Sequence, residues 1–313
     1  MIINPLKLTL AQAVQEFELD MVGIKTESTI KSYTYTTGWL IDFLGGDVPV
    51  DQITVRDLRR WRAAVAGRPG KSVYTLDRHI RSCRRFFNWC VEEGLVEKSP
   101  ARRLAKPKLP RDEPKAITMP DLEKMLEVAK EDTPRNYAIL RFLAETGCRV
   151  QGLTTLKMVD LNLAGCRALV REKGQKARRV QFGDITAEII RAWLVERPNY
   201  LIGGPLRDYG SFRRADDALF LGRKGNMTGS GVYYILKTLA KAAGVSRNTN
   251  PHAFRHGLAR RMLSNRADLG TVSRILGHSD IEVTHKYYAV WTEEELFERH
   301  KEFGGLLGEG VLQ

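Results

Sequence analysis

Apolar residues recur every three or four positions in four stretches of the first hundred residues, which is the spacing of amphipathic helices. The stretches begin at Thr9, Thr26, Thr54 and Ser72, and glycines follow the second, third and fourth. Glycine is typical of the end of a helix. The pattern therefore predicts a compact, all-helical domain over residues 1–105.

The helical pattern stops at residues 106–115, where three prolines and alternating charges predict an extended, exposed linker. Residues 116–291 then predict a second domain, in which two short runs, Arg167–Arg171 and Arg178–Phe182, are typical of strands. The polar stretch 172–176 between them predicts a hairpin loop. Further helices are expected after Thr118, at residues 133–146, 185–195 and 230–243, and after Pro251. The expected fold class is mostly α, an all-helical domain followed by a mixed α+β domain with a small hairpin.

Composition points to a polyanionic partner. The 313 residues carry 50 Lys and Arg against 37 Asp and Glu, a net charge of +13. Nearly all of this excess lies in residues 56–111, which hold 16 basic and 5 acidic residues. Such a balance favours nucleic acid as the partner, with an anionic membrane surface as the second possibility.

The basic segment contains a stripe of arginines. Arg78, Arg81 and Arg85 share one face of the predicted fourth helix, beside an apolar face of the same period. Acids are nearly absent from this stripe, which favours contact with DNA phosphates over the alternative of an ordinary solvated surface. The expected DNA-binding residues are Arg78, Arg81, Arg85, Lys71, Lys106 and Lys108.

Several protein classes are excluded by what the sequence lacks. It contains no apolar run of the roughly 18 residues that span a membrane, and its first residues do not form a secretory signal. The four cysteines are scattered, without a Cys-x-x-Cys pair, so reduced thiols and a cytoplasmic location are expected. Because no phosphate-binding loop or cluster with metal-ligand spacing is found, we expect neither a cofactor nor a metal.

Four short segments of the second domain carry candidate chemistry. In one of them, Asn250 can cap a helix whose first residue is Pro251, which places His252 and Arg255 on one face near its N-terminus. A histidine and an arginine there suit a phosphate or oxyanion clamp. The other segments are Glu145–Val150, the hairpin Lys173–Lys176, and Leu276-Gly277-His278 with Tyr287 nine residues further on.

Taken in order, these segments resemble the tyrosine recombinase (phage integrase) family. That family has an arginine in a Thr-Gly-x-Arg turn, a lysine on a β-hairpin, His-x-x-Arg at a helix start, and Leu-Gly-His nine residues before a nucleophilic tyrosine. The match covers roughly residues 115–291. It implies that the catalytic residues are Arg149, Lys173, His252, Arg255, His278 and Tyr287.

The resemblance also implies a reaction and an assembly. Tyr287 would attack a DNA phosphodiester to give a covalent 3′-phosphotyrosine, the arginines would bind the phosphate, and Lys173 would protonate the departing 5′ oxygen. Monomers in solution would form tetramers on duplex DNA with short inverted-repeat core sites and exchange strands through a Holliday junction. Residues 1–105 would be the core-DNA-binding domain of the simple two-domain type, which lacks an arm-binding module. Residues 292–313 would form a terminal helix or tail that docks on a neighbouring protomer or, alternatively, covers its own core.

The match leaves alternatives open. Gly152 stands where the family usually has an acid, so Glu145 or Asp160 is expected to supply that carboxylate. Lys176 is an alternative to Lys173, and Tyr288 to Tyr287. Two rival functions are a nicking-closing topoisomerase and a DNA-binding regulator or architectural protein on a recombinase scaffold. Integration, excision and dimer resolution are all compatible with the residues.

Overall fold

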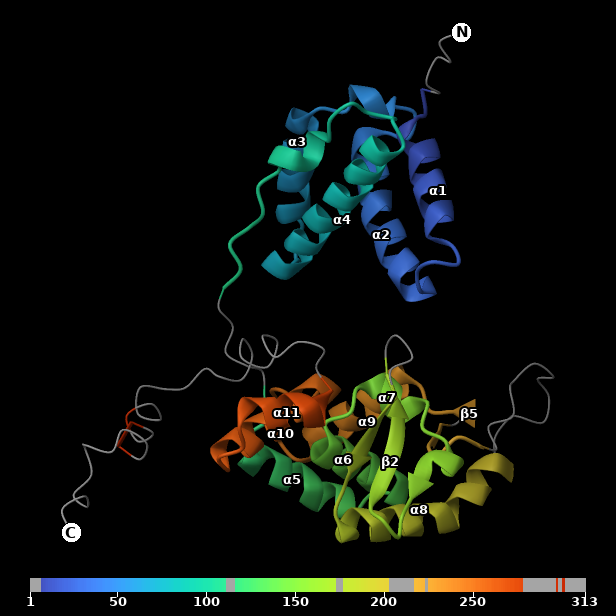
Figure 1. Cartoon of the computed structure of the whole chain (residues 1–313), viewed down its shortest axis with the longest axis vertical. Coiled ribbons are helices and arrows are strands. Elements are labelled where there is room, and N and C mark those ends of the chain that lie inside the picture. Colours follow the sequence, from blue (N-terminus) through green and yellow to red (C-terminus); the bar gives the residue numbers. More distant parts are fainter. Residues whose placement is uncertain are drawn as a thin grey trace. The chain divides into compact units, whose positions relative to one another are not determined.

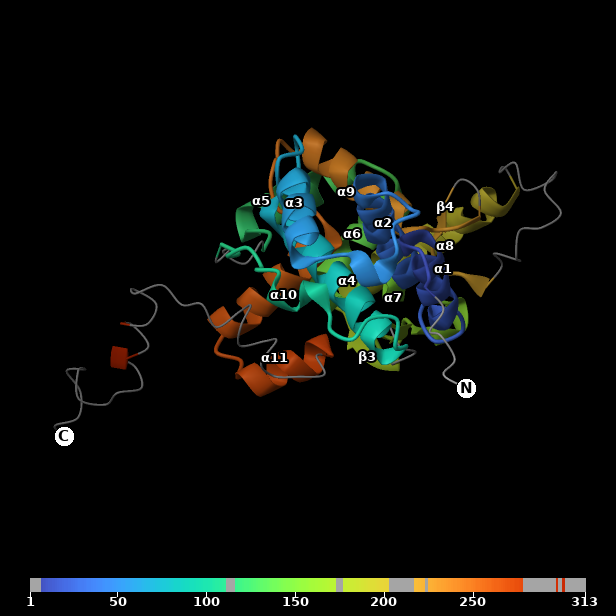
Figure 2. The same cartoon turned by 90° about the horizontal axis from the view of Figure 1, so that it is seen from above.

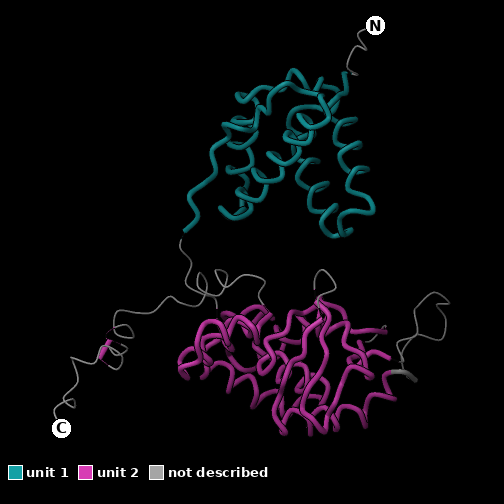
Figure 3. Tube along the Cα trace, viewed as in Figure 1, with its two compact units in different colours: residues 1–111 teal, residues 112–313 magenta. Residues whose placement is uncertain are grey.

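The computed structural model describes residues 7–110, 116–172, 177–202, 217–222, 225–277, 297 and 300–301. The chain divides into two compact units, residues 1–111 and 112–313 (Figure 3). Helices dominate both units, and short antiparallel strands occur in the second. The predicted fold class, mostly helical with a small sheet, is therefore confirmed.

The first unit is built on helices that begin at capping residues. Its elements are α1 (Leu10–Met21), α2 (Glu27–Leu44), α3 (Val55–Ala66) and α4 (Val73–Glu92), with 3-10 turns η1 (Val50–Gln52) and η2 (Pro100–Arg103) (Figure 1). The side-chain oxygens of Thr9, Thr54 and Ser72 accept hydrogen bonds from backbone N–H groups in the first turns of α1, α3 and α4. Such caps satisfy donors that a helix leaves unpaired at its start.

Helix α4 is the centre of this unit, in contact with α1, α2 and α3. Its buried face includes Phe86 and Phe87, and the Phe86 ring meets Phe17 of α1 edge to face at 5.5 Å between centroids. Burying each such side chain contributes about 1.5–3 kcal/mol. At the end of the unit, Arg62 of α3 donates to the carbonyl of Ala105 at 3.2 Å and Arg84 of α4 to that of Leu104 at 2.6 Å. These bonds tie the chain to α3 and α4 just before the proline-rich segment.

The second unit is arranged around α6. Its helices are α5 (Met119–Lys130), α6 (Pro134–Thr146), α7 (Val150–Thr154), α8 (Asp184–Ile202), α9 (Gly229–Ala242), α10 (Pro251–Ser264) and α11 (Leu269–Leu276), with the turn η3 (Met158–Asp160). Helix α6 contacts α5, α8, α9, α10 and strand β3. Its buried residues include Ile139, Leu140, Phe142 and Leu143, which join the main core of the unit. Helices α10 and α11 lie side by side at one end (Figures 1 and 2).

A three-stranded antiparallel sheet, in the order β1-β2-β3, lies against this helical core. Its strands are β1 (Leu161–Asn162), β2 (Arg167–Arg171) and β3 (Ala177–Gln181), and Leu169 pairs with Arg179 in the middle of the ladder. The predicted hairpin is confirmed, with its second strand one residue earlier than expected. A second, two-stranded ladder pairs β4 (Leu221–Gly222) with β5 (Gly225–Asn226).

Helix α8 is longer than predicted, because it continues through Pro198 to Ile202. Proline ordinarily weakens or ends a helix. Here Arg197 donates two hydrogen bonds to the carbonyl of Ala218, at 3.0 and 2.6 Å. The Tyr200 ring also meets the Trp193 ring at 5.0 Å. The Arg197 bonds are tertiary contacts and the ring contact lies within the helix, and together they hold its last turns in place.

Two further expectations concern the whole chain. The four cysteines are free thiols, and Cys83, Cys90 and Cys148 are buried. Burial raises the pKa of Cys148 to about 11, which keeps that thiol protonated and unreactive. Within the part of the chain that the structure describes, no helix is both long and apolar enough to cross a membrane.

Candidate active site

The segment that carries Arg149 is a tight turn between two helices. Helix α6 ends at Thr146, Gly147 adopts a left-handed conformation with φ of +55°, and Arg149 is the N-cap residue of α7. The Thr146 hydroxyl donates to the carbonyl of Phe142 at 2.6 Å and accepts from the Cys148 N–H at 3.3 Å. The Thr-Gly-x-Arg sequence thus stops one helix and starts the next with the arginine at the junction.

The segment that carries His252 and Arg255 begins helix α10 as the sequence predicts. The Asn250 side chain caps the helix by accepting from the Ala253 N–H at 3.1 Å, and Pro251 is the first helical residue. His252 is exposed, whereas Arg255 is only 4% exposed. The arginine therefore lies within the protein instead of on an open helix surface.

Arg255 joins three segments that are far apart in the sequence. Its Nη1 donates to the carbonyl of Gly147 at 2.8 Å, and its Nη2 donates to the carbonyl of Leu276 at 2.5 Å. Gly147 lies two residues before Arg149, and Leu276 lies two residues before His278. One buried guanidinium thus fixes the backbone leading to two other predicted site residues.

The electrostatics of this cluster are those of an anion site. Although His252 is exposed at the surface, the protein around its ring partly displaces water, and this desolvation, followed by the positive charges of Arg255 and Arg149, lowers the pKa of His252. Burial and the charges of His252 and Arg255 lower the pKa of the neighbouring His256 to about 4. His252 is therefore neutral at pH 7 and able to accept a proton, beside two arginines that favour a bound anion.

One residue of this cluster, Glu172, was not among the site residues predicted from the sequence. Its carboxylate is 5% exposed and accepts a hydrogen bond from the Arg149 backbone N–H at 2.8 Å. It also forms ion pairs with the guanidinium groups of Arg149 and of Arg178, the latter at 3.2 Å. Burial alone would raise the pKa of Glu172, but the Arg149 N–H and the two guanidinium charges lower it overall, so this carboxylate is ionised.

The expectation that Glu145 or Asp160 would supply the carboxylate near Arg149 is wrong. Glu145 instead accepts from Arg141 at 2.5 Å and from the Gly183 N–H at 2.8 Å. Asp160 forms its ion pair with Arg171. The polar neighbours of Glu172 predict a hairpin loop at this position instead of a buried carboxylate. The signal that could have found it is the period of two in β2, where Ala168 and Val170 are buried and Glu172 is next on the same face.

Several predicted site residues lie outside the described residues. These are Lys173, Lys176, His278, Tyr287 and Tyr288. Glu172 and strand β3 are the described parts of the chain that flank Lys173 and Lys176. The described chain reaches His278 through Gly277, the C-cap of α11. Their assignment therefore continues to rest on the order and spacing of the motifs.

The arginine stripe of the first unit lies on the exposed face of α4, as expected. Arg78, Arg81 and Arg85 are all exposed. The stripe is less free of acids than the sequence suggested, since Arg81 forms an ion pair with the buried Asp77 and Arg85 one with Glu92 at 3.3 Å. Lys71, Lys106 and Lys108 are exposed as well. This surface retains the charge expected of a phosphate-binding face.

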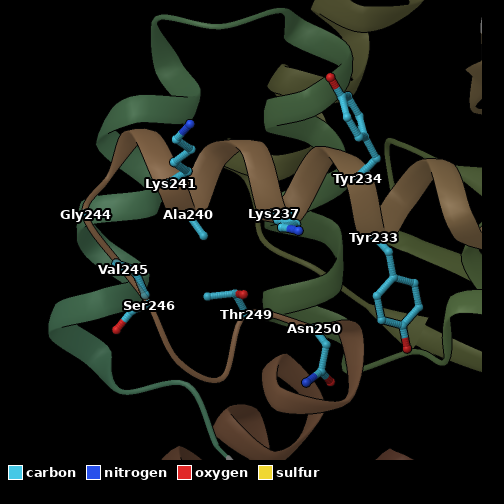
Figure 4. Close-up of a pocket in the computed structure, with 10 residues that line it drawn as sticks. All are labelled: Tyr233, Tyr234, Lys237, Ala240, Lys241, Gly244, Val245, Ser246, Thr249 and Asn250. Atoms are coloured by element: carbon cyan, nitrogen blue, oxygen red, sulfur yellow. The ribbon is translucent and has the colours of Figure 1, made fainter. Parts of the chain in front are cut away.

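A hollow of about 710 Å³ in the second unit does not coincide with this cluster. It lies between α9 and the loop that leads to Asn250, and Tyr233, Lys237, Lys241 and Thr249 are among its lining residues (Figure 4). Arg149, His252 and Arg255 are not among them. In the described ranges, no three His, Cys, Asp or Glu side chains gather as metal ligands do.

Comparison with known proteins identifies relatives along most of the chain. The Phage integrase family matches residues 115–294. Tyrosine recombinase XerD of Listeria monocytogenes is 31% identical over 290 residues, which cover 88% of this chain and 92% of that protein. Tyrosine recombinase XerC of Corynebacterium efficiens is 29% identical over 301 residues, or 94% and 91% of the two chains.

Solved structures share the fold. The XerH site-specific recombinase bound to palindromic difH substrate, a post-cleavage complex, has a TM-score of 0.75 at 19% identity and covers 95% of this chain and 98% of that one. The Tn1549 transposon integrase in complex with a circular intermediate DNA has a TM-score of 0.74 at 19% identity, with 94% and 99% covered. The resemblance drawn from the motifs is confirmed, and the chain belongs to the phage integrase family of tyrosine recombinases.

Proposed function

We propose that the protein is a site-specific DNA recombinase that cuts and rejoins duplex DNA through a covalent 3′-phosphotyrosine and exchanges strands through a Holliday junction. The observation that carries this proposal is the position of Arg255, which binds the carbonyls of Gly147 and Leu276. Those bonds hold the turn before Arg149 and the end of α11, which leads to His278, on either side of the predicted phosphate site. The relatives named XerD and XerC, both called tyrosine recombinases, support the same function.

The reaction needs a site that stabilises extra negative charge on a phosphate. Arg149 and Arg255 supply it, because guanidinium groups stay charged and donate in pairs to phosphate oxygens. Removing one such donor typically costs about 10²–10³-fold in rate. His252 lies beside both charges and is neutral at pH 7, since partial desolvation of its ring and the two arginines lower its pKa. It hydrogen-bonds the phosphate or accepts the proton of the nucleophile.

The covalent step is assigned to Tyr287. Its hydroxyl oxygen attacks phosphorus and loses its proton to a histidine, His252 or His278. The bond from phosphorus to the 5′ oxygen breaks, and Lys173 gives that oxygen a proton. Rejoining is the reverse attack by a 5′ hydroxyl. The phosphotyrosine conserves the energy of the broken strand, so the cycle needs no cofactor.

The first unit is assigned to DNA binding and the second to catalysis. The exposed arginines of α4, together with Lys71, Lys106 and Lys108, fit contacts to phosphates. We further propose that monomers assemble as tetramers on short inverted-repeat core sites in the cytoplasm, with residues 292–313 docking on a neighbouring protomer.

A direct test needs no known target. The protein is mixed with fragmented DNA from its source and denatured, and protein-linked DNA is captured and sequenced beside a Tyr287→Phe control. Adducts at one inverted repeat that disappear in the control support the proposal. Adducts spread over all sequences favour a nicking-closing topoisomerase, and the absence of adducts favours a DNA-binding protein.

A further inference from the structure

The space beside Gly152 is filled by another residue's side chain. A Cβ atom added at Gly152 would lie 3.2 Å from Cβ of Val170, 3.3 Å from Cγ of Glu172 and 3.6 Å from Oε1 of Glu172. Contacts of 3.2–3.3 Å are tighter than a carbon atom normally tolerates. The end of β2 therefore delivers a carboxylate into the place that a side chain on α7 would otherwise occupy.

This carboxylate holds both ends of Arg149. One oxygen accepts from the Arg149 backbone N–H at 2.8 Å, and the other accepts from its Nη1. Arg149 is the N-cap of α7 and has no side-chain capping bond of its own. The Glu172 carboxylate thus satisfies a donor at the start of α7 and also fixes the direction of the arginine side chain.

The same carboxylate connects the arginine turn to the end of α11. Arg178 of β3 donates to Oε1 of Glu172 at 3.2 Å and to the carbonyl of Ile275 at 2.6 Å. Glu172 also directly precedes Lys173 in the sequence. One ionised group therefore contacts the arginine turn directly, is linked to the end of α11 through Arg178, and precedes Lys173 in the sequence.

We propose that Glu172 is a positioning residue for Arg149, and that Gly152 is the matching change that makes room for it. In a chain with an acid at position 152, the carboxylate would come from α7. Here it comes from Glu172 at the end of β2, and Gly152 leaves the space on α7 that the Glu172 side chain fills. This inference rests on the proposed function for the role of Arg149, but the contact itself is independent of DNA.

The exchange can be reversed by design. The variants are Glu172→Gln, Gly152→Glu, and the double variant Gly152→Glu with Glu172→Gly. Glu188→Gln, an exposed residue of α8, is the matched control. Each full-length chain is assayed for the rate of adduct formation at saturating concentrations of a duplex that the wild type cleaves, for DNA affinity, and for Tm.

Glu172→Gln is expected to slow adduct formation by about 10- to 100-fold, because a misplacement near 1 Å can cost about 10²-fold. DNA affinity should stay within threefold. Gly152→Glu is expected to lower both Tm and rate, since it crowds Val170 and Glu172 and puts two carboxylates together. The double variant should be faster and more stable than Gly152→Glu alone, and within about tenfold of the wild-type rate. In an Arg149→Ala background, Glu172→Gln should cause no further loss of rate.

A wild-type rate in Glu172→Gln would overturn the inference, as would equal slowing with and without Arg149, or a double variant no better than the worse single one. Measurements of Tm test the inference separately from the proposed function. If the wild type forms no adduct, the proposed function fails, and a Tm cycle of Arg149→Ala with Glu172→Gln still decides the inference. Non-additive losses of Tm support the contact, and additive losses refute it.

Discussion

The guanidinium of Arg255 lies 2.5 Å from the carbonyl oxygen of Leu276, the last residue of α11, and donates a hydrogen bond to it. The same side chain binds the carbonyl of Gly147 at 2.8 Å. Two backbone segments that are more than a hundred residues apart are thus fixed by one buried side chain. The proposed phosphate ligand is therefore also part of the scaffold that positions the other ligands.

Replacing Arg255 by lysine should damage both stability and activity. A lysine ammonium is a single point of charge and cannot reproduce the planar fork that reaches both carbonyls. Leaving a buried carbonyl without its partner costs about 1–3 kcal/mol. We expect a lower free energy of unfolding in urea and at least a roughly 10²-fold slower adduct formation. Arg274→Lys, on the exposed surface of α11, should change neither quantity. Wild-type behaviour of Arg255→Lys would exclude the bridging role.

Alanine at Gly147 should disturb the turn before Arg149. Gly147 has φ of +55°, and an added Cβ would lie 2.9 Å from Leu258 and 3.0 Å from Leu276. The left-handed backbone alone costs about 1–2 kcal/mol for alanine, and crowding adds to it. Gly244→Ala is the control, because Gly244 has φ of +69° and nothing within 4 Å of the added atom. Thermal unfolding should show a larger loss for Gly147→Ala, and only that variant should slow cleavage. Equal losses would contradict this account.

The first unit should lose stability in mild acid through His79. This side chain is fully buried beside the rings of Trp39 and Tyr35. Burial, with the charges of Arg78, Lys71 and Arg68, lowers its pKa to about 4. The unfolded chain takes up a proton near pH 6.5 and the folded chain does not. The contribution of His79 is therefore complete above pH 6.5 and is lost as the pH falls toward 4, by at most about 3 kcal/mol.

Urea unfolding followed by tryptophan fluorescence measures this effect, since Trp39, Trp61 and Trp89 lie in the first unit. The His79→Phe variant keeps an aromatic ring and removes the titrating group. Its free energy of unfolding should fall less than that of the wild type between pH 7 and pH 4. Parallel curves for the two proteins would show that His79 does not carry the acid sensitivity.

The arginines of α4 should contribute unequally to DNA binding. Arg81 and Arg85 each form an ion pair with a carboxylate, whereas Arg78 forms none with any carboxylate among the described residues. Arg78→Gln should therefore weaken DNA binding more than Arg85→Gln and lower the slope of log K against log salt by about 1. Titrations at several salt concentrations measure both effects. Lys98→Gln, at an exposed lysine that follows α4 and is paired with Glu97, is the control, and an unchanged slope in Arg78→Gln would remove Arg78 from the DNA interface.

Much of the fold follows from local chemistry. The caps at Thr9, Thr54 and Asn250 are set by residues within three positions of each helix start, so the sequence alone predicts them. The continuation of α8 through Pro198 could not be predicted in this way. It depends on Arg197 reaching the carbonyl of Ala218, which is a tertiary contact.

The candidate site likewise combines residues that the sequence alone identifies with contacts that depend on the fold. Motif order identified Arg149, His252 and Arg255, but the role of Arg255 as a bridge depends on carbonyls that only the fold brings near it. Glu172 was missed because a carboxylate in a polar stretch is usually exposed. The alternation of β2 and the glycine at position 152 together carried the signal, and neither is informative without knowing that α7 faces β2.

The most direct test of the central claim is to locate the covalent bond. DNA-linked protein is digested with nuclease and trypsin, and tandem mass spectrometry identifies the residue that carries the remaining 3′-nucleotide phosphate. The proposed mechanism predicts this phosphate on Tyr287, with a free 5′ hydroxyl on the other DNA end, and no adduct in Tyr287→Phe. A nucleotide on Tyr288, or an adduct that persists in Tyr287→Phe, would contradict it.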